Sequence, residues 1–297
     1  MIKLIVSDMD GTLFNSNQEI SPFNLAAIKQ AEKNGVRFMI ATGRSMQTIK
    51  PTLEKYDLKC GLILMNGAEI RDEQLKIINT LNVDNSIIPK LAERLLNMGY
   101  IPEYMTENKA YLCGTKDMME TNMGWRMMCL DRSHTMTFEQ AKEAGKTSVF
   151  QKNLIRLDTI EDLFEQAIEV RKIIVFNPNT EMNINNREIL QKEFPELSIL
   201  SSYPENIEIN HEKAQKGSGL MQAIKKMNIE PDEVAVFGDG FNDISLFELF
   251  SHSYAPANAE LTIKEKASEI IPSNNDDGVG IKINELLFHN KIQQAAH

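Results

Sequence analysis

The chain opens with the stretch MIKLIVSDMDGTL (Met1–Leu13), in which a short apolar run ends at two carboxylates. Ile2 to Val6 is apolar and rich in β-branched residues, a pattern typical of a buried strand in a parallel sheet. Ligands of open parallel sheets bind at the carboxyl ends of the strands, so chemistry is expected in the turn that follows. Asp8 and Asp10 can face one site there, one as a nucleophile and the other as a proton carrier. Gly11 allows a tight turn or the close approach of a ligand.

The next elements alternate between helix and strand. A helix is predicted from Ser21-Pro22, an N-cap followed by a first-turn proline, to about Lys33. Residues 36–41 (VRFMIA) and 62–65 (LILM) are predicted as further buried strands. The helix between them is expected to be kinked or broken by Pro51. This alternation implies a parallel sheet with right-handed crossovers.

The amino-acid composition and the strand pattern of the chain change after about Leu81. Residues 83–210 are richer in Met, Asn and polar strands, and they are interpreted as an inserted α+β domain. The parallel pattern then resumes, with strands predicted at 234–237 and 270–271 and helices at 217–227, after 242, at 258–267 and at 280–288. We therefore predict an α/β core domain made of residues 1–82 and 211–297, interrupted by the inserted domain.

The composition is that of an ordinary globular protein, with 42% hydrophobic and 25% charged residues and a formal net charge of −10. This charge argues against general nucleic-acid or anionic-membrane binding, because both need a basic face. The three widely spaced cysteines fit free thiols better than disulfides or a zinc site. No stretch approaches the ~18 apolar residues of a membrane helix, and the amino-terminal apolar run is too short for a signal peptide. We expect a soluble cytoplasmic protein that binds neither nucleic acid nor membrane.

A second acidic turn, GDGFND (Gly238–Asp243), also follows an apolar strand. Glycines flank Asp239, whose carboxylate suits a hard cation such as Mg²⁺. A dinucleotide-binding fingerprint is excluded because Asp243 stands where its third glycine belongs. A calcium-binding loop is excluded for the first acidic turn, since Leu13 occupies the position of the required glycine. A purely structural turn stays open as an alternative for both segments.

Two weaker signals gain meaning only beside these turns. Thr42-Gly43-Arg44 follows a predicted strand, where a hydroxyl, backbone amides and a guanidinium could hold phosphate oxygens. Lys216 stands at the start of a predicted helix, whose positive end also favours an anion. Taken alone, the first is typical of a helix-capping turn and the second of a solvated lysine. An acidic protein that handles an acidic substrate must, however, gather positive charge locally.

In this order, the four segments resemble the motifs of the haloacid dehalogenase-like (HAD) superfamily, with DMDGTL as the first motif and GDGFND as the fourth. The long insertion, MNGA at 65–68 and NNDDGVG at 274–280 are similar to its Cof-type (type IIB) branch. The resemblance implies a Rossmann-like parallel-sheet core with an inserted α+β cap of type C2B. It also implies roles for individual residues, with Asp8 as the nucleophile and Asp10 as the acid and base. Mg²⁺ would be held by Asp8, the backbone carbonyl of Asp10 and Asp239, with Asp243 ordering the shell of the metal. Phosphate would be bound by Thr42, Lys216, Asn242 and the amides of Met9 and Gly43, and Arg44 and Asn66 are possible substrate contacts.

The function implied by the resemblance is hydrolysis of small phosphorylated metabolites, such as sugar phosphates, through an aspartyl-phosphate at Asp8. A phosphosugar mutase with the same machinery is an alternative. A non-catalytic metabolite sensor is a second alternative, although such a protein could have lost its nucleophile and this chain keeps Asp8.

Overall fold

The computed structural model describes residues 1–131, 133 and 135–295, which form two compact units. The first consists of Met1–Arg44, Thr48–Thr80 and Lys213–His297, and the second of Ser45–Gln47 and Leu81–Glu212. Each unit has its own sheet and its own hydrophobic core.

Within the described residues, the first unit contains an eight-stranded sheet in the order β14-β13-β12-β1-β2-β3-β4-β5. Its strands are β1 (Leu4–Ser7), β2 (Arg37–Ala41), β3 (Gly61–Leu64), β4 (Glu69–Arg71), β5 (Ile77–Thr80), β12 (Val234–Phe237), β13 (His252–Pro256) and β14 (Glu269–Ile271). The strands from β14 to β3 run parallel, whereas β4 and β5 pair antiparallel at one edge. The predicted α/β class with a parallel-sheet core is confirmed.

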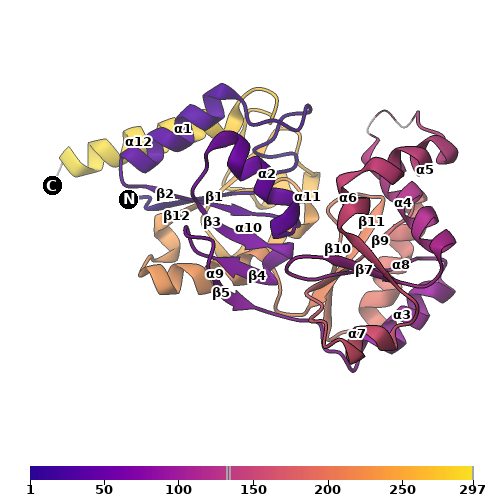
Figure 1. Cartoon of the computed structure of the whole chain (residues 1–297). Coiled ribbons are helices and arrows are strands. Elements are labelled where there is room, and N and C mark those ends of the chain that lie inside the picture. The colour runs from indigo at the N-terminus through magenta and orange to yellow at the C-terminus, as the bar shows by residue number, and fades with distance from the viewer. Residues whose placement is uncertain (132, 134, 296–297) are drawn as a thin grey trace. The chain divides into compact units, whose positions relative to one another are not determined.

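Helices cover both faces of this sheet (Figure 1). They are α1 (Pro22–Lys33), α2 (Met46–Tyr56), α9 (Lys216–Met227), α10 (Ile244–Leu249), α11 (Leu261–Lys266) and α12 (Gly278–Ala295), with short 3-10 turns η1 (Met65–Gly67), η2 (Pro231–Glu233) and η3 (Phe241–Asp243). α1 and α12 pack together on one face, and α9 and α10 lie on the other. On the α9 face, Leu4, Val6 and Val236 of the central strands pack against Leu220 and Phe247. Consecutive residues are buried along β1, β3 and β12, as a sheet covered on both faces requires.

Local sequence signals predict the start of α1 correctly but not the course of α2. Ser21 caps α1 as predicted, because its side chain accepts a hydrogen bond from the Asn24 amide. The predicted break at Pro51 is wrong, since α2 continues through this residue. Pro51 is exposed, so water can satisfy the helix carbonyl that lacks its usual amide partner.

Strand β13 was not predicted from the sequence. Its residues HSYAP contain no apolar run, yet four of the five are buried because β12 and β14 pair with it on both sides. The last helix is also longer than predicted, since α12 starts at Gly278 and ends at Ala295.

The second unit, as far as the structure describes it, contains a six-stranded sheet in the order β10-β11-β9-β6-β7-β8. Its strands are β6 (Glu103–Met105), β7 (Ala110–Cys113), β8 (Leu154–Leu157), β9 (Lys172–Phe176), β10 (Leu197–Leu200) and β11 (Asn206–His211), and its helices are α3 (Ile88–Asn97), α4 (Lys116–Leu130), α5 (Phe138–Thr147), α6 (Val149–Asn153), α7 (Glu161–Glu165) and α8 (Thr180–Glu193). Ile173 and Ile209 face a core that includes Leu91 of α3 and Leu190 of α8. On the other face, buried Glu103 accepts hydrogen bonds from Asn122 and Arg126 of α4. The unit is therefore an α+β layer structure.

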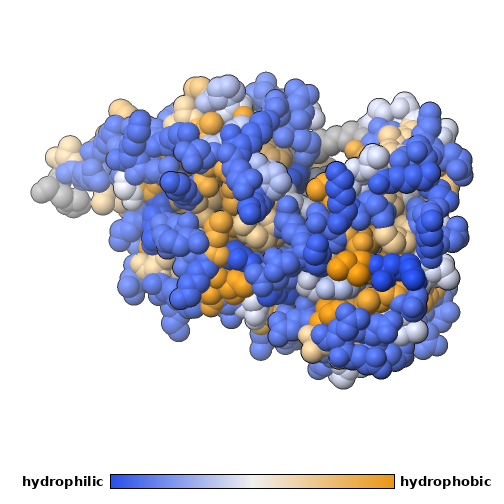
Figure 2. Space-filling view, viewed as in Figure 1, coloured by the Kyte–Doolittle hydropathy of each residue, from blue (hydrophilic) through white to orange (hydrophobic). Residues whose placement is uncertain are grey.

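The face of the molecule drawn in Figure 2 is largely hydrophilic, and its apolar residues appear in small separate groups. Among the described residues, no helix has both the length and the apolar character needed to cross a bilayer.

Candidate active site

The ends of three neighbouring strands of the first unit form the candidate site. Ser7 at the end of β1 is paired with Phe237 of β12 on one side and with Ile40 of β2 on the other. The residues that follow, including Asp8, Asp239 and Thr42, therefore lie at the same edge of the sheet. This is the edge at which open parallel sheets bind ligands.

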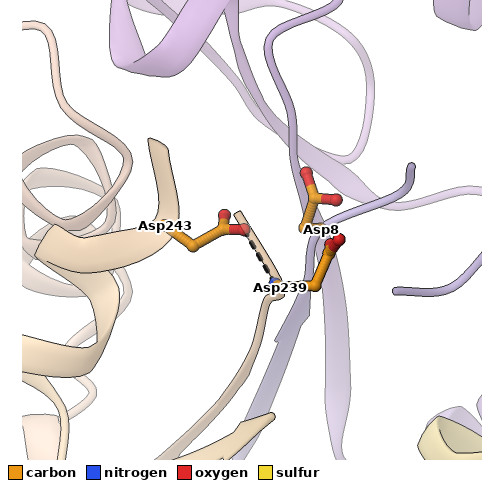
Figure 3. A group of neighbouring side chains, drawn as sticks. All are labelled: Asp8, Asp239 and Asp243. Carbon is orange, nitrogen blue, oxygen red and sulfur yellow. Dashed lines mark hydrogen bonds between the residues drawn. The ribbon is translucent and has the colours of Figure 1, made fainter. Parts of the chain in front are cut away.

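Three carboxylates meet at this edge. One oxygen from each of Asp8, Asp239 and Asp243 lies within 4.8 Å of the others (Figure 3). Asp243 is held in place by its second oxygen, which accepts hydrogen bonds of 3.0 Å from the amides of Asp239 and Gly240. Asp8 and Asp243 are buried, so like charges have been brought together away from water.

Lys216 supplies the opposing charge. It is the first residue of α9, and its side chain has no exposed surface. Its Nζ donates to Oδ1 of Asp8 and to Oδ1 of Asp243, both at 2.6 Å. Burial lowers the pKa of Lys216, but Asp243 and Asp8 outweigh this effect and raise the pKa above its usual value. The lysine is therefore a fixed cation between two acids.

A single ammonium does not compensate the acidic cluster. Burial, opposed by Lys216 but reinforced by Asp243 and Asp239, raises the pKa of Asp8 well above its ordinary value. Burial and the neighbouring Asp243 raise the pKa of Asp239 to about 7. The carboxylates thus repel one another, and a further cation would relieve this repulsion.

The donor set fits a divalent metal. Mg²⁺ prefers carboxylate oxygens, and two ligands on opposite sides of an octahedral ion lie roughly 4 Å apart. The oxygens of Asp8, Asp239 and Asp243 are spaced within 4.8 Å, close to that separation. Asp8 and Asp239 could therefore share one ion.

Thr12 belongs to the site, although the sequence interpretation gave it no role. Its buried hydroxyl donates to Oδ1 of Asp239 at 2.6 Å. Gly11 lies beside the same carboxylate with a φ of +86°, and a Cβ there would come within 2.2 Å of Asp239 Oδ2. The Gly-Thr pair of the DMDGTL stretch thus shapes the surroundings of Asp239. Only its adjacency to Asp8 and Asp10 could have indicated this.

Asp10 lies beside Arg44. Nε and one terminal nitrogen of Arg44 donate to the two carboxylate oxygens of Asp10, at 2.7 and 2.6 Å. The same terminal nitrogen donates to Gln18, and the guanidinium carbon stands 5.2 Å from the centre of the Phe14 ring. Arg44, expected as a substrate contact, is therefore bound to the expected acid and base.

The other expected phosphate-binding residues line the same edge. Thr42 is buried at the end of β2, where its hydroxyl accepts a hydrogen bond from the Arg44 amide, and Gly43 lies between them. Met9 is buried directly after Asp8. Asn242 donates to Oδ1 of Asn66 at 3.2 Å, and both side chains are buried. The structure thus brings Asn242 and Asn66 into contact.

The turn that holds Asn66 lies against the segment before Lys216. Met65, Asn66 and Gly67 all have positive φ values. A Cβ on Gly67 would come within 2.5 Å of the carbonyl oxygen of Gln215, so only glycine allows this approach. The turn after β3 therefore lies next to the start of α9.

Comparison with known proteins agrees with this arrangement. A sequence profile of haloacid dehalogenase-like hydrolases matches residues 5–283. Phosphatase YwpJ of Bacillus subtilis is 27% identical over 296 residues, covering 96% of this chain and 100% of that protein. The 5-amino-6-(5-phospho-D-ribitylamino)uracil phosphatase YwtE of the same organism is 29% identical, covering 96% of this chain and 98% of that protein. A solved haloacid dehalogenase-like hydrolase from B. subtilis superimposes with a TM-score of 0.80 and 26% identity, covering 96% of this chain and 100% of its own. The chain belongs to the haloacid dehalogenase-like hydrolase family, in its Cof-type branch.

Proposed function

We propose that this protein is a Mg²⁺-dependent phosphatase that hydrolyses small phosphorylated metabolites through an aspartyl-phosphate at Asp8. The observation that carries the proposal is the buried contact between Asp8 and Lys216, at 2.6 Å, beside Asp239 and Asp243. A carboxylate that is to attack a phosphate dianion needs positive charge next to it, and Lys216 provides part of it.

In the first step, an Oδ atom of Asp8 attacks phosphorus and the bond from phosphorus to the leaving oxygen breaks. Asp10 gives its proton to that oxygen, so that an alcohol leaves rather than an alkoxide. Asp10 has to be protonated for this step, and its contact with Arg44 has to loosen. In the second step, Asp10 takes a proton from water, the water oxygen attacks phosphorus, and the bond to Asp8 breaks to release phosphate.

Two further roles follow from the donors at the strand ends. Lys216, the Thr42 hydroxyl, Asn242 and the amides of Met9 and Gly43 would bind the transferring group. Asp8, the Asp10 carbonyl and Asp239 would hold Mg²⁺, with Asp243 ordering their surroundings. Bound there, the ion would neutralise negative charge shared by the carboxylates and the phosphate. Asn66 and Arg44 are proposed as substrate contacts.

The proposed substrate class is a small cytoplasmic phosphate monoester. Both named relatives are phosphatases, and YwtE is named for a phosphorylated ribityl compound, which supports this class. The second unit, residues 83–210 in the proposed division, would serve as the cap that excludes water and selects the substrate.

The test is release of inorganic phosphate from a panel of phosphorylated metabolites and from p-nitrophenyl phosphate, with Mg²⁺ and with EDTA. Asp8→Asn should reduce turnover by at least ~10³-fold, because the amide is no nucleophile. Asp232→Asn, an exposed acid of the same unit, is the matched control and should keep full activity. Full activity of Asp8→Asn would exclude Asp8 as the nucleophile. Isomerisation of a sugar phosphate without phosphate release would indicate the alternative function of a phosphosugar mutase. Binding of a metabolite without turnover would indicate the alternative of a non-catalytic sensor.

A further inference from the structure

The turn that carries Asp10 and Thr12 is held from outside by two asparagines of the carboxyl-terminal part of the chain. Residues 9–14 fold back on themselves, since the Phe14 amide donates to the Met9 carbonyl at 2.8 Å. The carbonyls of Gly11 and Phe14 accept hydrogen bonds from the side-chain amides of Asn258 and Asn274, each at 2.8 Å. These contacts join residues that lie about 250 positions apart in the chain.

The two asparagines are joined to each other. The backbone amide of Asn274 donates to Oδ1 of Asn258 at 2.9 Å, so Asn258 binds the turn with one end of its amide and Asn274 with the other. Asn274 is buried, with only 6% of its surface exposed, and its bond to Phe14 is shielded from water. A buried amide bond of this kind has little freedom, because leaving either partner unsatisfied is unfavourable.

The turn between these contacts carries the groups whose position matters most. Asp10 precedes Gly11, and Thr12, which donates to Asp239, lies between the two held carbonyls. Gly11 has a positive φ that it adopts at no steric cost, so the local sequence does not by itself restrict the turn. Besides the bonds of Thr12 to Asp239 and of Arg44 to Asp10, the two asparagines restrict the backbone of the turn itself.

We propose that Asn274, with Asn258, is a positioning residue that fixes this turn so that Asp10 can protonate the leaving oxygen. The inference rests on the proposed role of Asp10 as the acid. Neither asparagine touches the reacting atoms. Their effect is to set where Asp10 stands, and a misplacement on the order of 1 Å can slow an enzyme by about 10²-fold.

The test compares two substrates that differ in their need for an acid. Ribose-5-phosphate loses an alkoxide unless the leaving oxygen is protonated, whereas p-nitrophenyl phosphate loses a stable phenolate. The quantity to measure is kcat/KM, which reports the steps up to phosphoryl transfer to Asp8. Asn274→Ala and Asn258→Ala should lower kcat/KM for ribose-5-phosphate by roughly 10-fold to 100-fold, and for p-nitrophenyl phosphate by less than about 3-fold. Asp10→Asn removes the acid altogether and so gives the largest expected difference between the losses of kcat/KM on the two substrates.

Asn290→Ala is the matched control. Asn290 also binds backbone from a distance, since its amide contacts both the N–H and the carbonyl of Ile2, before the opposite end of β1. This variant should lower the melting temperature and leave the ratio of the two kcat/KM values unchanged. A purely structural role of Asn274 would give the same result as Asn290→Ala, and equal losses on both substrates in folded Asn274→Ala would overturn the proposal. Asn258 is exposed, so its variant decides the question if Asn274→Ala does not fold.

Hydrogen exchange gives a readout that does not depend on the catalytic role of Asp10. The Phe14 amide should exchange faster in Asn274→Ala than in the wild type, and at the wild-type rate in Asn290→Ala. Unchanged exchange at Phe14 would overturn the proposal even if activity falls. If Asp10→Asn fails to distinguish the two substrates while Phe14 exchange does rise, the role of Asp10 is wrong and the positioning of the turn stands.

Discussion

Replacing Lys216 by methionine is the most direct test of the charge arrangement at the site. The substitution keeps much of the side-chain volume and removes the ammonium, which lies 2.6 Å from both Asp8 and Asp243. The side chain of Lys216 has no exposed surface. Removing one partner of a buried ion pair costs roughly 3–5 kcal/mol, because the remaining charge has no compensation. We therefore expect the melting temperature in EDTA to fall by on the order of 10 °C.

Magnesium should restore part of this loss. In the wild type, the ammonium and the metal share the same carboxylates, so each weakens the attraction felt by the other. In Lys216→Met the metal alone neutralises Asp8, and Mg²⁺ should raise the melting temperature more than it does in the wild type. Phosphatase activity should still fall by roughly 10²-fold to 10³-fold, since a donor to the transferring group is lost.

The assay is thermal unfolding in EDTA and in Mg²⁺, followed by phosphate release at saturating Mg²⁺. Lys225→Met is the matched control, because Lys225 is an exposed lysine on the same helix and should change neither quantity. If Lys216→Met unfolds in EDTA at the wild-type temperature, the two ion pairs do not hold the site together and the electrostatic reasoning is refuted.

Two further predictions concern the metal and the carboxylate next to it. The pKa of Asp239 is raised to about 7 in the folded chain, so the folded state binds this proton more tightly than the unfolded state does. Without metal, the free energy of unfolding should therefore decline as the pH rises from about 4 to about 7, and Mg²⁺ should abolish this decline. Urea unfolding at several pH values, in EDTA and in Mg²⁺, measures both effects. A free energy of unfolding that rises over this range in EDTA would contradict the raised pKa of Asp239. Thr12→Val removes the hydroxyl that donates to Asp239 and should weaken Mg²⁺ binding, measured by calorimetry, by roughly 10-fold to 100-fold. An unchanged affinity for Mg²⁺ would show that Thr12 does not orient the Asp239 carboxylate.

Local patterns were sufficient for much of the core domain. The apolar runs before Asp8 and Gly238 correspond to β1 and β12, each of which has four consecutive buried residues. A short apolar run that ends at a polar turn is typical of a buried strand, so the sequence was enough to predict them. Ser21-Pro22 marked the start of α1 because capping depends only on neighbouring residues. β13 escaped prediction because its burial is imposed by β12 and β14 rather than by its own composition.

The sequence by itself determined that acids and a threonine follow strands of the parallel sheet and that a lysine starts a helix. Only the tertiary structure decided what each side chain contacts. Lys216 could have been a solvated lysine, and its two ion pairs arise because α9 starts beside the end of β1. Arg44 contacts Asp10, and Asn274 binds the carbonyl of Phe14. Both pairs are far apart in the chain, so no local pattern predicts them. Composition and periodicity report on neighbours along the chain, whereas the partners of a buried charge are set by where the fold brings distant segments together.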